Sequence, residues 1–348
     1  MVKKLLLGIF SGFFTLVLLA GLAWVGLNWY AEQPLRENPE EVLEFTIRPG
    51  DSLIRVASRL SDAGWLEYPQ VIRLLARIDD NVAGGIHAGD YLIPGSINKH
   101  ELLQMFVSGD VRYYDVVLVE GSTLGEALQV LNEHEKLSQP LDGDAFQRLL
   151  AELGIEGNPE GQFYPDTYFF QAGDTVESVL RRANARMSSV LAEEWEVRSK
   201  KLPYKTPYEA LIMASLIEKE TGAGWERPEI SGVFVRRLGK RMRLQTDPTV
   251  IYGMGDRYQG RLSRRMLRED TPYNTYTRHG LPPTPIALVG REAINAALNP
   301  KGGKALYFVA RGDGTHHFSE TLAEHNRAVR KYQIVERRED YRSTLEAQ

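Results

Sequence analysis

The sequence predicts an α+β protein with one apolar N-terminal helix, a small α+β region and a larger α+β domain. Three observations lead to this prediction. An uncharged apolar run occupies residues 5–29, three later segments each join an apolar strand to an amphipathic helix through a glycine turn, and the second half joins helices through turn-rich stretches. A chain of 348 residues has room for two or three modest domains.

The apolar run at residues 5–29 is about 25 residues long, which is enough to span a bilayer. Lys3 and Lys4 precede it, as expected on the cytoplasmic side. Aromatic side chains stand near its far end, where they mark a membrane interface: Trp24, Trp29 and Tyr30. A cleaved signal peptide is the alternative, but its apolar region usually runs about 7–15 residues. We therefore expect a retained single-pass anchor, with residues 1–4 in the cytoplasm and the remainder beyond the membrane.

Residues 30–41 are polar and carry two prolines, so we expect an extended tether there. Folded structure should begin near Val42, and residues 42–155 should form the small α+β region. Each of its three strand–turn–helix segments has a glycine in the turn and a serine that can cap the helix. The glycines are Gly50, Gly95 and Gly121, and the serines are Ser52, Ser96 and Ser122.

Residues 156–335 should form the second, larger α+β domain, and residues 336–348 a charge-rich tail. The region from about Asp142 to Lys200 is expected to be mainly helical, with one long helix from Val176 to Val197. The turn-rich stretch at residues 157–170 interrupts it with prolines and aromatic residues.

Composition excludes several classes of function. A net charge of −4 offers no broad basic field, so we expect no nucleic-acid partner. The absence of cysteine excludes disulfides, thiolate metal sites and a cysteine nucleophile. The chain carries no phosphate-binding glycine loop, and its histidines at 316, 317 and 325 come without an HExxH pattern. We therefore expect neither a cofactor nor a metal.

The strongest local pattern is TPYEALIMASLIEKETG, from Thr206 to Gly222. Thr206 is a good N-cap, Pro207 suits the first helical position, and Glu209 completes a capping box. Gly222 suits a left-handed end of the helix. The sequence thus predicts a helix with both ends defined.

This helix is apolar nearly all round, so it should be buried. At about 100° per residue, Glu218 and Glu220 fall on opposite sides of it. Burial and the negative end of the helix dipole should both raise the pKa of Glu218 into the range of a general acid. A structural ion pair with Lys219 or Arg227 is the alternative, and the helix alone does not decide between them.

Three later loops place hydrogen-bonding residues among glycines and prolines: LQTDPTVIYG at 244–253, YNTYTRHGLPP at 273–283 and HHFSETLAEHN at 316–326. Neutral donors and flat aromatic rings suit a sugar polymer, whose hydroxyls need many uncharged partners. We expect these loops to form a cleft with Glu218. The predicted substrate-binding residues are Gln245, Asp247, Tyr252, Tyr273, Asn274, His325 and Asn326.

In these segments the chain resembles the endolytic murein transglycosylase family, also called YceG-like. The shared motifs are EGQFYPDTY at 160–168, ASLIEKETG at 214–222, LQTDPTVIYG at 244–253, YNTYTRHGLPPTPI at 273–286, AALNP at 296–300 and HHFSETLAEHN at 316–326. The likeness runs from the anchor to about residue 330, and Thr284 stands where we expect a glycine between two prolines. The resemblance implies that Glu218, the first glutamate of the EKE triplet, is the catalytic residue.

The resemblance also implies an enzyme of the bacterial inner membrane, facing the periplasm, that cuts the β-1,4 bond between N-acetylmuramic acid and N-acetylglucosamine in nascent peptidoglycan strands. Glu218 would protonate the glycosidic oxygen and then accept the proton of the muramic C6 hydroxyl, which closes a 1,6-anhydro ring. Such cuts would terminate strand elongation, and glycan polymerases (penicillin-binding proteins) would be the protein partners.

Two other interpretations stay open. A lysozyme-like muramidase needs a second carboxylate, for which Asp247 is the candidate. A tethered peptidoglycan-binding scaffold would have no activity. It is favoured by the segment at 48–52, RPGDS, which resembles the opening turn of a LysM carbohydrate-binding module and makes residues 42–155 a LysM-like region. Tyr68 and Pro69 then lead into a helix that departs from that pattern, and a small scaffold domain that binds no sugar is the equal alternative for this region.

Overall fold

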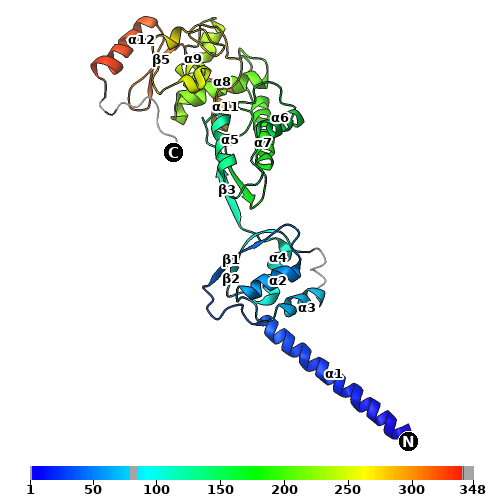
Figure 1. Cartoon of the computed structure of the whole chain (residues 1–348). Coiled ribbons are helices and arrows are strands. Elements are labelled where there is room, and N and C mark those ends of the chain that lie inside the picture. Colours follow the sequence, from blue (N-terminus) through cyan, green and yellow to red (C-terminus); the bar gives the residue numbers. More distant parts are fainter. Residues whose placement is uncertain (1, 79–84, 339, 341–348) are drawn as a thin grey trace. The chain divides into compact units, whose positions relative to one another are not determined.

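The computed structural model of the protein describes residues 2–78, 85–338 and 340, and the chain divides into two compact units (Figure 1). Unit 1 comprises Met1–Tyr114 and Phe170–Gly173, and unit 2 comprises Asp115–Phe169 and Asp174–Gln348. The division falls within the paired strands β3 (Tyr113–Val117) and β4 (Thr167–Gln171). The predicted mixture of helices and strands is confirmed.

Unit 1 consists of α1 (Val2–Glu32), β1 (Val42–Ile47), α2 (Leu53–Asp62), α3 (Pro69–Ile78), β2 (Gly89–Pro94) and α4 (Lys99–Ser108). Strands β1 and β2 pair antiparallel, with Val42 opposite Pro94 and Ile47 opposite Gly89. At the centre of the core, the buried rings of Tyr91 and Phe106 meet edge to face, with centroids 5.0 Å apart. The two strands and the inner faces of the helices therefore share one core.

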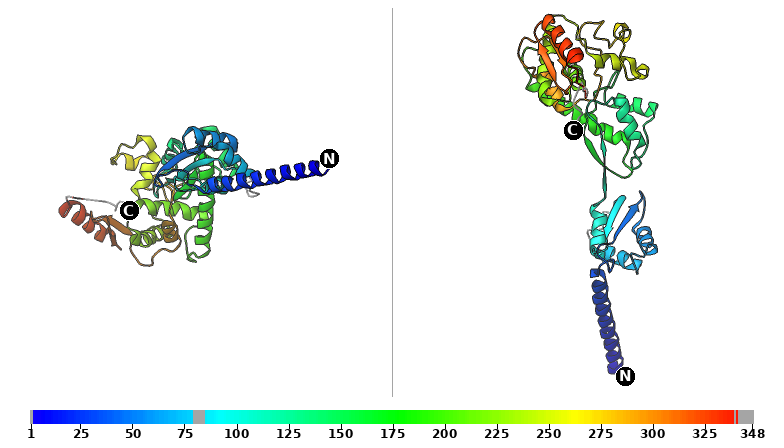
Figure 2. Two further views of the ribbon diagram at one scale, coloured as in Figure 1. Left: turned by 90° about the horizontal axis from the view of Figure 1, so that it is seen from below. Right: turned by 90° about the vertical axis from the view of Figure 1, so that its left-hand side faces the viewer.

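Helix α1 is long and apolar enough to cross a membrane over Phe10–Glu32, with a mean hydropathy of 2.0 and none of that window buried. Figure 2 shows it from two further sides as one uninterrupted helix at the N-terminal end of unit 1. By length and composition it fits either an anchor or a signal sequence.

The prediction of an extended tether at residues 30–41 is wrong. Ala31 is fully buried, and the N–H of Leu35 donates to the carbonyl of Ile97 at 2.9 Å. The buried ammonium of Lys99 donates to two carbonyls just past α1, those of Gln33 and Pro34, at 3.0 and 3.2 Å. Polar composition and prolines are typical of a linker, but the backbone groups of this segment find partners in the turn before α4.

The helix caps of this region were predicted in part. Ser52 caps α2 as expected. Helix α4 begins at Asn98 rather than Ser96, and α5 (Leu124–Glu133) begins at Thr123 rather than Ser122, each with a complete capping box. The reason is register, because only Asn98 and Thr123 have a glutamate three residues later that can return the hydrogen bond.

Unit 2 contains, besides α5, the elements α6 (Gly143–Glu152), α7 (Val176–Glu196), α8 (Pro207–Glu220), α9 (Arg227–Gly239), α10 (Asp247–Met254), α11 (Arg291–Leu298), β5 (Tyr307–Ala310), β6 (His316–Ser319) and α12 (Leu322–Val329). Short 3-10 turns occupy Gly224–Glu226, Gly255–Arg257 and Met266–Arg268, and a π turn follows α12 at Arg330–Val335. Strands β5 and β6 form an antiparallel hairpin.

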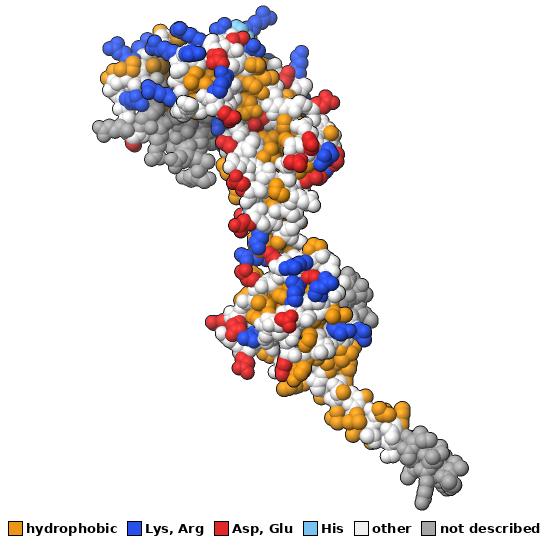
Figure 3. Space-filling model, viewed as in Figure 1, with side chains coloured by type: hydrophobic (Ala, Val, Ile, Leu, Met, Phe, Trp, Pro, Cys, Tyr) orange, Lys and Arg blue, Asp and Glu red, His pale blue; other side chains and the backbone are white. Residues whose placement is uncertain are grey.

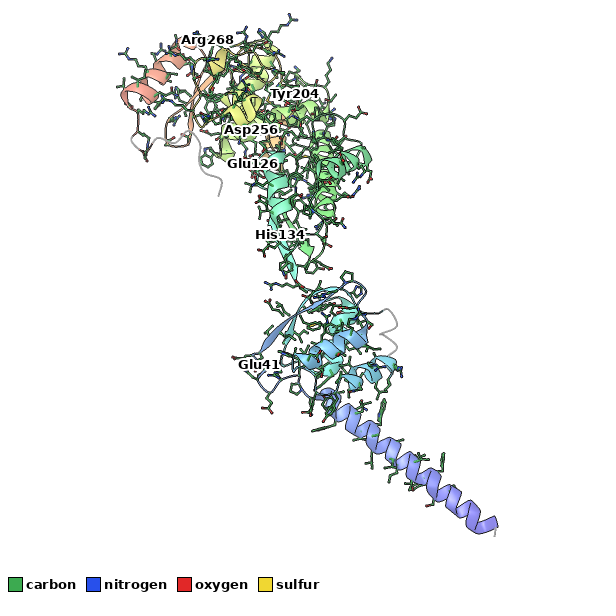
Figure 4. The ribbon with its side chains drawn as sticks, viewed as in Figure 1. Glu41, Glu126, His134, Tyr204, Asp256 and Arg268 are labelled. Carbon is green, nitrogen blue, oxygen red and sulfur yellow. The ribbon has the colours of Figure 1, made fainter. Side chains whose placement is uncertain are left out.

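Helix α8 lies in the core of unit 2 and packs against α7, α9 and α11. Every side chain from 210 to 217 is buried, as the apolar sequence predicts. Tyr204, labelled in Figure 4, donates its hydroxyl hydrogen to the carbonyl of Ala297 and so ties the segment before α8 to α11. This packing fixes the position of the last turn of α8.

Unit 2 begins at Asp115, well before the predicted domain boundary near residue 155. The third strand–turn–helix segment therefore belongs to the same unit as Glu218, not with the two segments before it. The physical reason is hydrogen bonding between the turn of this segment, at Gly121 and Ser122, and Leu288 in the loop before α11.

Candidate active site

Helix α8 carries Glu218 in its last turn. The helix begins at its predicted cap but does not end as predicted. Thr206 Oγ1 accepts the N–H of Glu209 at 3.2 Å. The carboxylate of Glu209 accepts the N–H of the residue before Thr206, at 2.5 Å, so the predicted capping box is not formed as expected. The helix ends at Thr221 with an extended backbone (φ −147°), so the predicted left-handed end at Gly222 is wrong.

The carboxylate of Glu218 is buried and held from two sides. Its side chain is 4% exposed; Oε1 accepts Arg227 Nη2–H at 2.7 Å and Oε2 accepts the N–H of Gly290 at 3.1 Å. Arg227 opens α9, and its guanidinium meets two further carboxylates, those of Glu292 (2.5 Å from Nη1) and Glu120 (3.6 Å from Nη2). One buried cation thus joins three acidic side chains.

The electrostatics of Glu218 combine both alternatives that the sequence left open. Burial is the largest influence and raises the pKa of Glu218, and the negative charge of Glu120 acts in the same direction. The guanidinium of Arg227 and the N–H of Gly290 lower it, but the net direction is upward. Glu218 is therefore ion-paired and also biased toward the protonated form.

The turn at residues 119–122 lies beside Glu218, although the sequence argument placed it in a separate domain. Lys219 Nζ donates to the carbonyl of Gly121 at 2.9 Å, and the N–H of Gly121 donates to the carbonyl of Leu288 at 2.9 Å. These bonds join the start of α5, the end of α8 and the loop before α11.

Besides Glu292, the sequence reasoning missed Glu120 as an acidic residue of this site. It lies so close to Gly290 that a Cβ on that glycine would stand 1.9 Å from Glu120 Oε1. The sequence did carry one signal for Glu120, because this acidic residue directly precedes the turn glycine Gly121 at the end of an apolar strand segment.

Two of the predicted aromatic residues lie together. The rings of Tyr252 and Tyr273 meet edge to face with centroids 4.9 Å apart, and Asn158 Nδ2 donates to both phenolic oxygens at 3.2 and 3.3 Å. Tyr252 donates its hydroxyl hydrogen to Glu160 Oε2 at 3.1 Å. Glu160 is buried, which raises its pKa, and it also accepts the N–H of Leu124 at 2.8 Å. This tyrosine group is therefore connected to the start of α5, next to Glu120.

Of the predicted residues, Gln245 lies in the loop before α10 and Asp247 is the first residue of α10; the last residue of α8 holds this segment in place. Glu220 accepts the hydroxyl hydrogen of Thr246, and burial raises the pKa of Glu220 to about 7. Asp247 Oδ1 accepts the hydroxyl hydrogen of Tyr276 at 2.5 Å, and Gln245 adopts a positive φ of 55°. Glu220, on the side of α8 opposite Glu218, therefore holds the segment before α10.

The remaining predicted residues make contacts that do not include Glu218. Asn274 is fully buried, and its amide donates to three carbonyls of the preceding loop, those of Met266, Leu267 and Glu269. Asn274 therefore supports its loop from within instead of facing a substrate. The imidazole of His325 stacks on Tyr307 at 5.3 Å, and Asn326 is exposed on α12.

Across residues 10–78, 85–338 and 340, no three histidine, aspartate or glutamate side chains are placed to hold a metal ion. Two hollows of unit 2 lie near Met242 and near Trp195, and none of the predicted site residues lines either one.

The YceG-like family model matches residues 45–331. The chain belongs to the YceG-like family. The Bacillus subtilis (strain 168) protein named endolytic murein transglycosylase is 30% identical over 318 residues, covering 86% of this chain and 87% of that protein. The Streptococcus pneumoniae (strain D39) protein of the same name is 25% identical over 359 residues, covering 91% of this chain but 63% of that protein.

A crystal structure of a YceG-like protein from Listeria monocytogenes has a TM-score of 0.53 and 27% sequence identity, covering 83% of this chain and 99% of that one. The YceG-like match begins within β1 and ends in the turn after α12, so it includes parts of both units. Glu218 and all seven predicted substrate-binding residues lie inside it, whereas α1 does not. The family resemblance read from the sequence is confirmed.

Proposed function

We propose that this protein is a membrane-bound lytic murein transglycosylase that cuts peptidoglycan glycan strands with Glu218 as its acid and base. The names of its curated relatives support the activity. One observation supports the assignment of the catalyst: a nearly inaccessible carboxyl in the last turn of a core helix, with a pKa raised by burial.

In the proposed reaction, protonated Glu218 gives its proton to the oxygen of the β-1,4 bond between N-acetylmuramic acid and N-acetylglucosamine. The bond from C1 of the muramic residue to that oxygen breaks, and the carboxylate then takes the proton of the muramic C6 hydroxyl. The C6 oxygen bonds to C1, so the products are a 1,6-anhydro-muramic end and a free N-acetylglucosamine hydroxyl. Water is not consumed.

The contacts of Glu218 suit both halves of this reaction. Burial favours the neutral acid that the first step needs. Once the proton has left, Arg227 and the N–H of Gly290 stabilise the carboxylate that serves as base in the second step. A single side chain can therefore perform both proton transfers.

A muramidase is the second candidate, and the position of Glu120 favours it. Glu120 and Glu218 both approach Nη2 of Arg227, and the Glu120 side chain is 45% exposed. A second carboxylate at such a position can activate water, as glycoside hydrolases require. Asp247, the earlier candidate for this role, is hydrogen-bonded to Tyr276.

The proposed location is the outer face of the bacterial inner membrane, with α1 as a retained single-pass anchor. Two N-terminal lysines before an apolar helix support this orientation. Attachment to that membrane would concentrate the enzyme on newly polymerised strands, so that its cuts end their elongation and glycan polymerases (penicillin-binding proteins) become its partners.

Unit 1 is proposed to be LysM-like and to bind glycan. The order β1–α2–α3–β2, with the strands antiparallel, and the turn formed by Arg48 to Ser52 support this assignment. Without activity in unit 2, such a module would make the protein a tethered peptidoglycan-binding scaffold.

Mass spectrometry of glycan fragments released by the full-length protein tests the proposal. Glu218→Gln keeps the shape but cannot transfer the proton, and Glu209→Gln on the same helix is the control. Anhydro-muramic ends from wild type and Glu209→Gln, and none from Glu218→Gln, are expected. Reducing ends would make the enzyme a muramidase, equal cleavage by all three would remove Glu218 from the mechanism, and binding without cleavage would leave a scaffold.

A further inference from the structure

The groove between α1 and α3 is apolar on both walls and open to solvent. We propose that lipids of the outer leaflet fill this groove, so that α3 lies in the membrane interface beside the anchor. The inference rests on the proposal that α1 is a retained anchor. It adds a second membrane contact, made by the folded part of unit 1.

One wall of the groove consists of small and aromatic residues of α1 between Ala20 and Tyr30. The other wall consists of Tyr68, which directly precedes α3, and of Val71, Leu74 and Ile78 on α3. Tyr68 is 52% exposed, and Leu74 and Ile78 are each 45% exposed. Figure 3 shows hydrophobic side chains on α1 and on the adjoining face of unit 1. Large exposed apolar side chains in one continuous patch mark a surface that meets a partner.

Helix α3 is apolar on two faces, which the core of unit 1 does not require. Ile72 and Leu75 are buried in that core, whereas Leu74 and Ile78, one helical turn apart, are turned outward. Exposed Arg73 and Arg77 flank the outer apolar stripe. Apolar side chains bordered by arginines are typical of helices that lie in the headgroup region of anionic membranes.

The length of α1 places the groove at the level of the outer membrane surface. Its 31 residues give a helix of about 46 Å at 1.5 Å per residue, whereas the hydrocarbon core of a bilayer is about 30 Å thick. With Lys3 and Lys4 on the cytoplasmic side, as proposed, this core takes up about 20 residues counted from Leu5, so the C-terminal third of α1 stands in the outer headgroup region. That third contains Trp24, Trp29 and Tyr30, which line the groove and prefer the membrane interface.

Helix α3 cannot easily move away from α1, because α1 is fixed to the rest of unit 1. Tyr30 meets Tyr68 edge to face at 5.5 Å, and the ammonium of Lys99 lies 4.4 Å from the centre of the Tyr30 ring. The Lys99 bonds to the carbonyls after α1 tie α1 to α4, and α4 in turn contacts α3, so α3 is held at one level along α1. Inserting α1 into a bilayer thus brings the outer face of α3 to its surface.

Lipid is the occupant that the structure favours, because one wall of the groove belongs to the exposed apolar surface of α1, which is long and apolar enough to cross a membrane. The chain lacks cysteine, so a single fluorophore can be placed at will. Leu74→Cys on α3 tests the groove. Leu92→Cys on β2, a leucine of similar exposure (42%) outside the groove, is the matched control.

Both variants, as full-length protein in phosphatidylethanolamine–phosphatidylglycerol vesicles, carry an environment-sensitive dye, and lipids with a nitroxide high on the acyl chain serve as quencher. We expect at least twofold quenching at residue 74 and little at residue 92. Equal quenching at both positions, or none at either in protein that floats with the vesicles, would overturn the inference while leaving the anchor intact. Protein that does not float would overturn both, although glycan cleavage could persist.

A second copy of the chain is the other possible occupant. In that case, Leu74→Cys would form an intermolecular disulfide that increases with the protein-to-lipid ratio, and the nitroxide lipids would not quench its dye. That result would also overturn the inference.

Discussion

Removing the Arg227 guanidinium, which holds Glu218, should destabilise unit 2 strongly. Replacing both Arg227 and Glu218 should cost less free energy of unfolding than the sum of the two single replacements. The Arg227 side chain is 10% exposed and that of Glu218 is 4% exposed, with 2.7 Å between Nη2 and Oε1. With an effective dielectric constant of about 20, attraction at such a distance is on the order of 5 kcal/mol, which is an upper limit because both groups lost their hydration. Deleting one partner of a buried pair usually costs roughly 3–5 kcal/mol.

We therefore expect Arg227→Met to lower the free energy of unfolding by roughly 3–5 kcal/mol at pH 7. Glu218→Gln should cost only about 1–2 kcal/mol, because Arg227 keeps its contacts with Glu120 and Glu292. The double variant should recover about 2 kcal/mol relative to the sum of the single changes. Urea unfolding of the full-length protein in detergent, read by hydrogen exchange in peptides of α8 and α11, reports unit 2 alone.

The loss in Arg227→Met should also depend on pH. The pKa of Glu218 is raised by burial, and without the guanidinium it must rise further. A raised carboxyl pKa gives stability that is present below the unfolded pKa and lost as the pH rises through the folded one. The deficit of Arg227→Met should therefore shrink toward pH 5. A cost below about 1 kcal/mol, or strict additivity with Glu218→Gln, would refute the reasoning.

Three further outcomes are expected. Gly290→Ala should slow the initial rate of glycan cleavage roughly tenfold, because the added Cβ displaces the Glu120 carboxylate. Gly302→Ala, where a Cβ meets nothing within 4 Å, is the control. Equal rates for the two variants would count against the close approach of Glu120 to Gly290. Burial raises the pKa of Glu220 from 4.5 to about 7, so stability should fall as the pH rises through about 7, by at most about 3 kcal/mol. Glu220→Gln should flatten the dependence of the thermal unfolding temperature on pH. An unaltered dependence would argue against a raised pKa of Glu220. Tyr252→Phe should cost about 1–2 kcal/mol in urea unfolding, because a buried carboxylate loses its donor; no change would mean that the bond contributes nothing.

The regular elements were largely predictable because their information is local. The long helix expected from Val176 to Val197 is observed as Val176–Glu196, and α8 begins at its predicted cap. The tether at residues 30–41 was not predictable, because its partners lie in the turn before α4, more than 60 residues along the chain. Local polarity cannot reveal that a backbone carbonyl will meet a buried lysine.

The site residues were likewise predictable where the information is local, and were not where it depends on contacts between distant segments. Glu218 was singled out by its place in a helix that is apolar nearly all round, and the family resemblance implied its catalytic role; Arg227 was named as one of two possible ion-pair partners. Glu120 was missed because it reaches Glu218 only through a turn that bonds to Lys219, 98 residues away. A single sequence carries no direct record of such pairings, so the domain boundary was also placed too late.

The Lys99 contacts mean that α1 cannot be exchanged for another helix without loss to unit 1. A soluble form that starts at Val42 would leave a buried ammonium without its two carbonyls and would uncover the hydrophobic surface beneath Ala31. Grafting a foreign transmembrane segment onto that position would carry the same defect. A truncated protein intended for crystallisation or drug screening should therefore begin no later than Leu27, where the final turn of α1 still closes the core of unit 1.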